Sequence, residues 1–262
     1  VFIRHSTGEN WLRDDDGGLG IAVREARYFV NDTSYGWGLD DADSGYGTIG
    51  DHTDVGNFYS WFVGPNRSTY LAALDALSSQ SSSYSRLGTD SGGANRVVLI
   101  KSCFPNSNLQ GSLADPVPPI ASNPLRHQDS ASEHHTFANA KGIYQSLLTY
   151  FATRQDVLFV LVTSPPLPDA STSPEAAALA RALNDLLVSG WLAGYSHRNV
   201  FDYFNVLTSD GGSTRADEPA TNDLGWSDGD HHRHRSGLVD HLMIVSTGTS
   251  AYGSSGDDSH PS

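Results

Sequence analysis

Short apolar runs alternate along the chain with longer segments in which apolar residues recur at helical spacing. A short, continuous run of β-branched and other apolar residues is typical of a strand buried in a parallel sheet. The clearest example is Val97-Val98-Leu99-Ile100. Segments of this kind predict five strands, at residues 1–3, 28–30, 97–100, 157–162 and 199–207.

Helical periodicity fills most of the gaps between these segments. We expect two short helices between residues 10 and 27, and longer helices at residues 68–87, 137–151 and 174–195. Strands that alternate with helical crossovers form a doubly wound parallel sheet with helices on both faces. The pattern therefore predicts a single α/β domain over residues 1–262, with three α/β/α layers and a mainly parallel sheet of five strands.

Three long loops interrupt this pattern, at about residues 39–56, 104–135 and 208–236. The second is rich in proline and long for a compact domain, which is typical of a lid or a binding loop. The first has acidic residues and a histidine among glycines, and solvation is the more frequent role for such residues, with a metal site as the alternative. These residues are Asp40, Asp41, Asp43, Asp51, His52 and Asp54.

An aromatic cluster follows the first loop. Core packing is the default expectation for such residues, and a wall for a sugar ring is the alternative. The cluster consists of Phe58, Tyr59, Trp61 and Phe62.

The composition excludes several classes of partner. The formal net charge of −14, from 30 acidic and 16 basic residues, repels nucleic acids, so we expect no nucleic-acid partner. No apolar run is long enough to span a membrane, and the single cysteine, Cys103, excludes an internal disulfide. The chain begins on a strand pattern without the charged and apolar regions of a signal peptide, which decides nothing about secretion.

Two motifs at opposite ends of the chain are candidates for chemistry. Ser6 follows the first predicted strand, and open α/β sheets carry their chemistry there, although a serine in this place is also an ordinary helix cap. Near the other end, Asp257 precedes His260 by three positions. A carboxylate at this spacing can hold one imidazole nitrogen while the other takes the proton of a serine hydroxyl.

With these motifs the chain resembles the SGNH (GDSL-like) hydrolase superfamily, which has a flavodoxin-like fold. The resemblance rests on a serine after the first strand, a glycine after the second, an asparagine after the third, and Asp-x-x-His-Pro near the carboxyl end. It implies that Ser6 is the nucleophile and that Asp257 and His260 complete a catalytic triad. It also implies that Ser6, Gly36 and Asn106 form the oxyanion hole.

The motifs differ from the usual family pattern, because His5-Ser6-Thr7-Gly8 stands in place of Gly-Asp-Ser. Alternatives therefore stay open for three positions: Gly38 for Gly36, Asn108 for Asn106, and Asp258 for Asp257. Residues expected to contact the substrate are Trp37, Arg233 and Arg235. The two arginines lie among histidines, where their charge disfavours a metal ion and suits an anionic group, although plain solvation is an equal alternative.

The resemblance implies a secreted or periplasmic bacterial serine esterase that needs no cofactor and no metal. Its expected substrate is an ester of a small molecule or polysaccharide, with an acylated carbohydrate as the first choice. Two other functions remain open at this point: a lyase that cleaves polysaccharide with a tyrosine or histidine base, and a surface binding or assembly protein without turnover. The sequence does not predict the oligomeric state.

Overall fold

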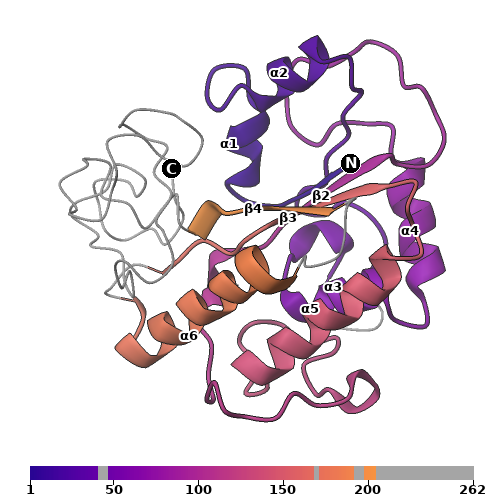
Figure 1. Ribbon diagram of the computed structural model, residues 1–262. Coiled ribbons are helices and arrows are strands. Elements are labelled where there is room, and N and C mark those ends of the chain that lie inside the picture. The colour runs from indigo at the N-terminus through magenta and orange to yellow at the C-terminus, as the bar shows by residue number, and fades with distance from the viewer. Residues whose placement is uncertain (41–46, 168–170, 192–197, 205–262) are drawn as a thin grey trace.

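The structure is a computed structural model, and it describes residues 1–40, 47–167, 171–191 and 198–204. Within these ranges the chain forms one sheet of four parallel strands in the spatial order β1-β2-β3-β4 (Figure 1). The strands are β1 (Phe2–Ile3), β2 (Val97–Lys101), β3 (Leu158–Val162) and β4 (Arg198–Phe201). The predicted α/β class with a parallel sheet is therefore confirmed.

The register of the sheet places the carboxyl ends of all strands at one edge. Phe2 pairs with Leu99 between β1 and β2, and Leu99 pairs with Val160 between β2 and β3. Residues that follow the strands, such as Ser6 after β1 and Ser102 after β2, are therefore delivered to this edge. It is the edge at which open α/β sheets bind their ligands.

The strand predicted at residues 28–30 does not form. The chain instead meets β1 at one parallel bridge between Phe2 and Asp32, where the Phe2 N–H donates to the Asn31 carbonyl at 2.8 Å and the Thr33 N–H donates to the Phe2 carbonyl at 3.1 Å. β1 has only two residues, so its backbone pairing with this segment is limited to the one bridge. Five strands are thus not confirmed.

Helices cover both faces of the sheet, which is consistent with three layers (Figure 1). One face carries α3 (Val55–Phe62), α4 (Arg67–Ala76), α5 (Phe137–Phe151) and α6 (Pro174–Asp185), and the other carries α1 (Gly8–Leu12) and α2 (Leu19–Glu25). Side chains alternate along a strand. Ile100 and Leu161 therefore lie in the larger core with α3 and α5, whereas Phe2 and Leu99 pack with Leu12 of α1.

Capping residues explain where the two longest helices begin. The side chain of Thr136 caps α5 and that of Ser173 caps α6, and each accepts a backbone N–H of the first turn. Pro174, whose ring fixes a helical φ, is the first residue of α6. The chain then continues as a π-helical segment, Leu186–Trp191, and the last residues of the predicted helix, 192–195, lie outside the described residues.

The helix predicted at residues 68–87 is shorter than expected. α4 ends at Ala76, and the serine-rich segment after it approaches Asp32, whose carboxylate accepts the Ser81 N–H and the Ser82 hydroxyl. Serine favours such bonds over helical ones, because its hydroxyl competes with the backbone. A buried carboxylate therefore draws this segment out of the helix.

The aromatic cluster belongs to the core. Phe58, Trp61 and Phe62 of α3 have no exposed surface. Next to them, Phe151 of α5 stacks on Phe159 of β3 with ring centroids 3.9 Å apart. The predicted core role of these residues is confirmed.

The predicted loops differ in how far the structure describes them. The loop at residues 104–135 is described throughout and contains two short 3₁₀ turns, Phe104–Ser107 and Ile120–Ser122. The loop at residues 39–56 is described in part, and the loop at residues 208–236 lies outside the described residues. Among the described helices, none combines the length and the apolar character needed to cross a membrane.

Candidate functional site

Ser6 occupies a sharp turn between β1 and α1. Its φ of 51° lies in the left-handed region, which is uncommon for residues other than glycine and stores backbone strain. The Glu9 N–H donates to the Ser6 carbonyl at 3.0 Å, and the Gly8 N–H donates to the His5 carbonyl at 3.3 Å. A serine on a strained strand-to-helix turn is the arrangement found at a nucleophile elbow.

Several polar groups of this turn have no hydrogen-bond partner among the described residues. The Ser6 side chain is half-buried, and its hydroxyl has no hydrogen-bond partner among the described residues. Within the same ranges, the backbone N–H groups of Ser6 and Thr7 have no acceptor either. Thr7 has a right-handed φ of −55°, and successive N–H groups on residues of opposite handedness form a concave nest for an anion.

The predicted oxyanion donor Gly36 already uses its N–H, which donates to Asp51 Oδ1 at 2.8 Å. Asp51 Oδ2 accepts the N–H and the hydroxyl of Thr48. Partial burial raises the pKa of Asp51, but the hydrogen bonds from Thr48 and Gly36 outweigh it, so the net shift is downward. Gly36 and its alternative Gly38 have φ values of 73° and 96°, which explains why glycine stands at both positions.

The other predicted donor, Asn106, is 1% exposed. Its Nδ2 donates to the carbonyls of Thr53 at 3.1 Å and Cys103 at 3.3 Å, and its Oδ1 accepts the Val55 N–H at 3.1 Å. Both N–H bonds of the amide are therefore used inside the fold and are not offered to a substrate. The alternative, Asn108, is exposed.

Of the two aromatic residues that flank Gly36, one is packed and one is exposed. Trp37 is half-buried and packs against the larger core. Tyr35 is 62% exposed, and its ring lies edge-on to that of His5 with centroids 5.5 Å apart. An exposed aromatic ring thus lies against the residue that precedes Ser6.

The remaining predicted site residues lie outside the described residues. They are Asp257, Asp258, His260, Arg233 and Arg235. The catalytic triad therefore stays a prediction. The alternative of a metal site in the first loop is tested only in part, because residues 41–46 lie outside the described residues. In the described part of the chain, no three His, Cys, Asp or Glu side chains are grouped so as to hold a metal ion.

A histidine–carboxylate pair lies in the first loop. His52 Nδ1 is 3.8 Å from Asp54 Oδ2, and the hydrogen bond with Asp54 is the main cause that raises the pKa of His52, against the opposing effect of burial. Between them in sequence, the Thr53 hydroxyl is hydrogen-bonded to His5 Nδ1 at 3.0 Å. This loop is thereby connected to the residue next to Ser6.

A second histidine, His135, is buried with one nitrogen unpartnered. Its Nδ1 lies 3.1 Å from the carbonyl of Asn108, and because a carbonyl only accepts, Nδ1 carries the proton. The Nε2 atom has no hydrogen-bond partner in the described ranges. Burial lowers the pKa of His135, which favours the neutral form of its ring.

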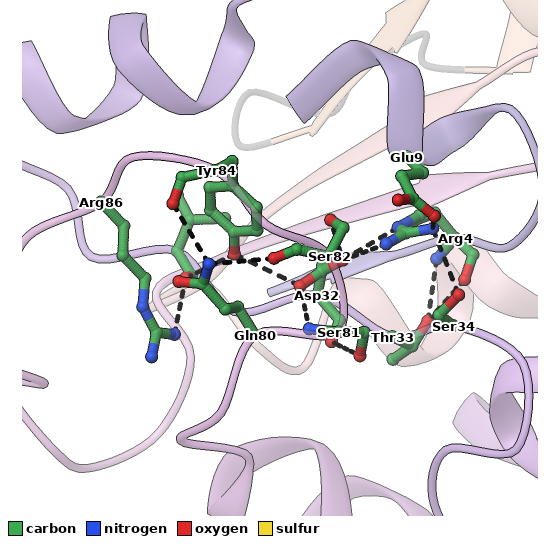
Figure 2. Close-up of polar contacts among 11 residues, drawn as sticks. Arg4, Glu9, Asp32, Thr33, Ser34, Gln80, Ser81, Ser82, Tyr84 and Arg86 are labelled. Atoms are coloured by element: carbon green, nitrogen blue, oxygen red, sulfur yellow. Dashed lines mark hydrogen bonds and ion pairs between the residues drawn. The ribbon is translucent and has the colours of Figure 1, made fainter. Parts of the chain in front are cut away.

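A buried ion pair connects Arg4, two residues before Ser6, with Asp32 (Figure 2). The side chains of Arg4 and Asp32 have no exposed surface, and Arg4 Nε donates to Asp32 Oδ2 at 2.9 Å while Nη2 binds the same oxygen. Asp32 also accepts the Ser82 hydroxyl at 3.1 Å and the Tyr84 hydroxyl at 3.3 Å. The sequence signal for this pair is an arginine directly after the first apolar run.

Lys101, the last residue of β2, is 1% exposed. Its Nζ donates to the Ser102 carbonyl at 3.5 Å, and it forms no ion pair with a carboxylate of the described residues. Burial, together with the positive charge of Arg4, lowers the pKa of Lys101. Two buried basic side chains, those of Arg4 and Lys101, therefore lie next to Gly8, two residues after Ser6.

Comparison of this chain with protein-family models, with curated proteins and with solved structures gave no match.

Proposed function

We propose that this protein is a serine hydrolase that cleaves esters by acyl transfer through Ser6. The observation that carries the proposal is the left-handed φ of 51° at Ser6, on the strand-to-helix turn at the carboxyl edge of the sheet. An ordinary helix cap has an extended backbone and bonds its hydroxyl to an N–H of the first turn, and Ser6 does neither within the described residues. Strain of this kind is concentrated at catalytic sites.

The proposed reaction consists of two acyl transfers. Ser6 Oγ attacks the acyl carbon while its proton passes to His260, which Asp257 orients. The alcohol oxygen then leaves with that proton, and the acyl group remains as an ester on Ser6. In the second transfer, water loses a proton to His260 and adds to the acyl carbon, and Ser6 Oγ leaves with the proton as the carboxylic acid is released.

The negative charge that develops on the acyl oxygen requires donors close to Ser6. The N–H groups of Ser6 and Thr7 suit this role better than Gly36 and Asn106, because the donors of the latter two are engaged. One well-placed donor contributes about 3 kcal/mol to the transition state. This set of donors keeps Ser6, which the resemblance also implies. It has the Thr7 N–H in place of Gly36 and Asn106.

We extend the proposal to an acylated carbohydrate as substrate and to a secreted or periplasmic enzyme. Tyr35 offers an exposed ring against His5, next to the Ser6 turn. A tyrosine ring combines a large apolar face with a polar tip, which suits a sugar ring that has both apolar and hydroxyl surfaces.

Covalent labelling with a fluorophosphonate tests the proposal on the full chain. We expect the wild-type protein to carry the label on Ser6 and to release acetate from an acetylated sugar. Ser6→Ala should lose both, whereas Ser122→Ala, at a serine on the exposed turn Ile120–Ser122, is the matched control and should keep both. His260→Gln and Asp257→Asn should remove labelling of Ser6. If Asp258→Asn removes labelling and Asp257→Asn does not, the residue that orients His260 is Asp258.

Other outcomes would change the assignment. Undiminished ester hydrolysis by Ser6→Ala would overturn the proposal. Unsaturated sugar ends that absorb in the ultraviolet, formed without release of acetate, would identify a lyase. Carbohydrate binding with neither reaction would identify a binding protein.

A further inference from the structure

One buried guanidinium, carried by Arg4 before the Ser6 turn, lies close to Glu9 after the turn and is bound to Asp32 (Figure 2). Before the turn, the Arg4 N–H donates to the Thr33 hydroxyl at 2.9 Å, and the Arg4 side chain binds Asp32. After the turn, the carboxylate of Glu9 lies 3.7 Å from Arg4 Nη1. The segment that contains Ser6 is therefore tied down at its start and at its end by the same side chain.

Gly8 brings α1 into direct contact with this arginine. A Cβ at Gly8 would lie 2.8 Å from Arg4 Cβ and 3.0 Å from Arg4 Cδ. In addition, Arg4 Nη1 donates to the Ser34 hydroxyl at 3.3 Å. Because α1 rests on the Arg4 side chain, a change in the position of that side chain moves the turn and lets Ser6 relax from its left-handed φ.

The ion pair is specific in geometry as well as in charge. Two charges are tolerated in a protein interior only when they are paired and their remaining hydrogen-bonding groups are satisfied. Asp32 meets this condition through Arg4 and through groups of Ser81, Ser82 and Tyr84. The guanidinium binds as a planar fork, and a lysine ammonium cannot reproduce that geometry.

We infer that Arg4 and Asp32 are positioning residues for Ser6. Their ion pair holds the strand-to-helix turn so that the Ser6 hydroxyl and the N–H groups of Ser6 and Thr7 keep the geometry needed for acyl transfer. Neither side chain touches the substrate, because both are fully buried. The inference rests on the proposed function of Ser6.

The test compares Arg4→Lys with Arg154→Lys in the full chain. Arg154 forms a similar two-bond pair with Asp156, at 3.0 Å for each bond, on the surface and away from Ser6, which makes it the matched control. In Arg4→Lys, the rate of fluorophosphonate labelling and kcat for ester hydrolysis should fall about 100-fold, since a displacement of about 1 Å costs this factor. KM and the pH profile should stay at wild-type values, and Arg154→Lys should match the wild type throughout.

Thermal unfolding of each variant separates positioning from stability. An Arg4→Lys protein that is folded and keeps the wild-type labelling rate and kcat would overturn the inference. So would a loss of activity that only follows the folded fraction. If Arg4→Lys does not fold, the double variant Glu9→Gln/Ser34→Ala decides, because it removes only the contacts of Nη1: slower labelling supports the inference and wild-type labelling overturns it.

The result for the wild type distinguishes this inference from the proposed function. A wild-type protein that neither labels nor hydrolyses esters would overturn both. An active wild type with an equally active, folded Arg4→Lys variant would overturn the positioning role alone.

Discussion

The side-chain carbonyl of Asn106 accepts the N–H of Val55 at 3.1 Å and so joins the turn after β2 to the first residue of α3. The amide nitrogen of the same side chain binds the carbonyls of Thr53 and Cys103. An asparagine whose place after a strand resembles that of a catalytic donor therefore connects two segments of the fold, the turn after β2 and residues 53–55.

Replacement of Asn106 should cost stability. Asn106→Ala is expected to lower the free energy of unfolding by about 3 kcal/mol, because three backbone groups lose their partner in the protein interior. Urea unfolding measures the change, and Asn108→Ala, at an exposed position, should stay within about 0.5 kcal/mol of the wild type. An Asn106→Ala protein of wild-type stability that has lost ester hydrolysis would instead return the side chain to the oxyanion hole.

The hydroxyl of Tyr144 should stabilise the carboxyl edge of the sheet. It is hydrogen-bonded to Ser102 and Ser164, whose own hydroxyls are 2.6 Å apart, and burial raises its pKa. Tyr144→Phe is expected to lower the free energy of unfolding by about 1 kcal/mol. Tyr28→Phe, on a ring that is 56% exposed, is the control in the same urea titration. Equal midpoints for the two variants would contradict the prediction.

His52 should make part of the stability depend on pH. Its pKa in the folded protein is raised above 6.5, chiefly by the hydrogen bond with Asp54. A group of this kind stabilises the fold fully below its unfolded pKa, and that contribution is lost as the pH rises through the folded pKa. The stability difference between wild type and His52→Gln should therefore shrink as the pH rises above 6.5. An NMR titration that places the folded pKa of His52 at or below this value would contradict the prediction.

Close packing at Gly8 should exclude a larger residue. In Gly8→Ala, the added Cβ would meet Arg4 Cβ at 2.8 Å and Lys101 Cδ at 3.1 Å. Overpacking of this kind is expected to lower the free energy of unfolding by about 2 kcal/mol. Gly88→Ala, where a Cβ meets nothing within 4 Å, is the control and should be neutral or slightly stabilising. Identical melting temperatures for Gly8→Ala and the wild type would show that α1 moves aside freely.

Secondary structure could be predicted from the sequence where a segment is a short, continuous run of apolar residues. The runs at residues 97–100 and 157–162 became β2 and β3, because a continuous apolar run has only one stable place, between two layers of helix. The same reasoning placed Phe58 and Trp61 in the core. The prediction of a strand at residues 28–30 was wrong. β1 has only two residues, and the following segment meets it at a single bridge, Phe2 with Asp32.

The sequence by itself determined the order along the chain of the four strands that form and the place of Ser6 after the first of them, since both follow from local periodicity. The tertiary structure decided which polar groups near Ser6 are still available. Gly36 is bound by Asp51, and Arg4 is bound by Asp32, 28 positions away. The reason is physical: each buried donor or acceptor must be satisfied, and its partner comes from whichever distant segment the packing brings within about 3 Å.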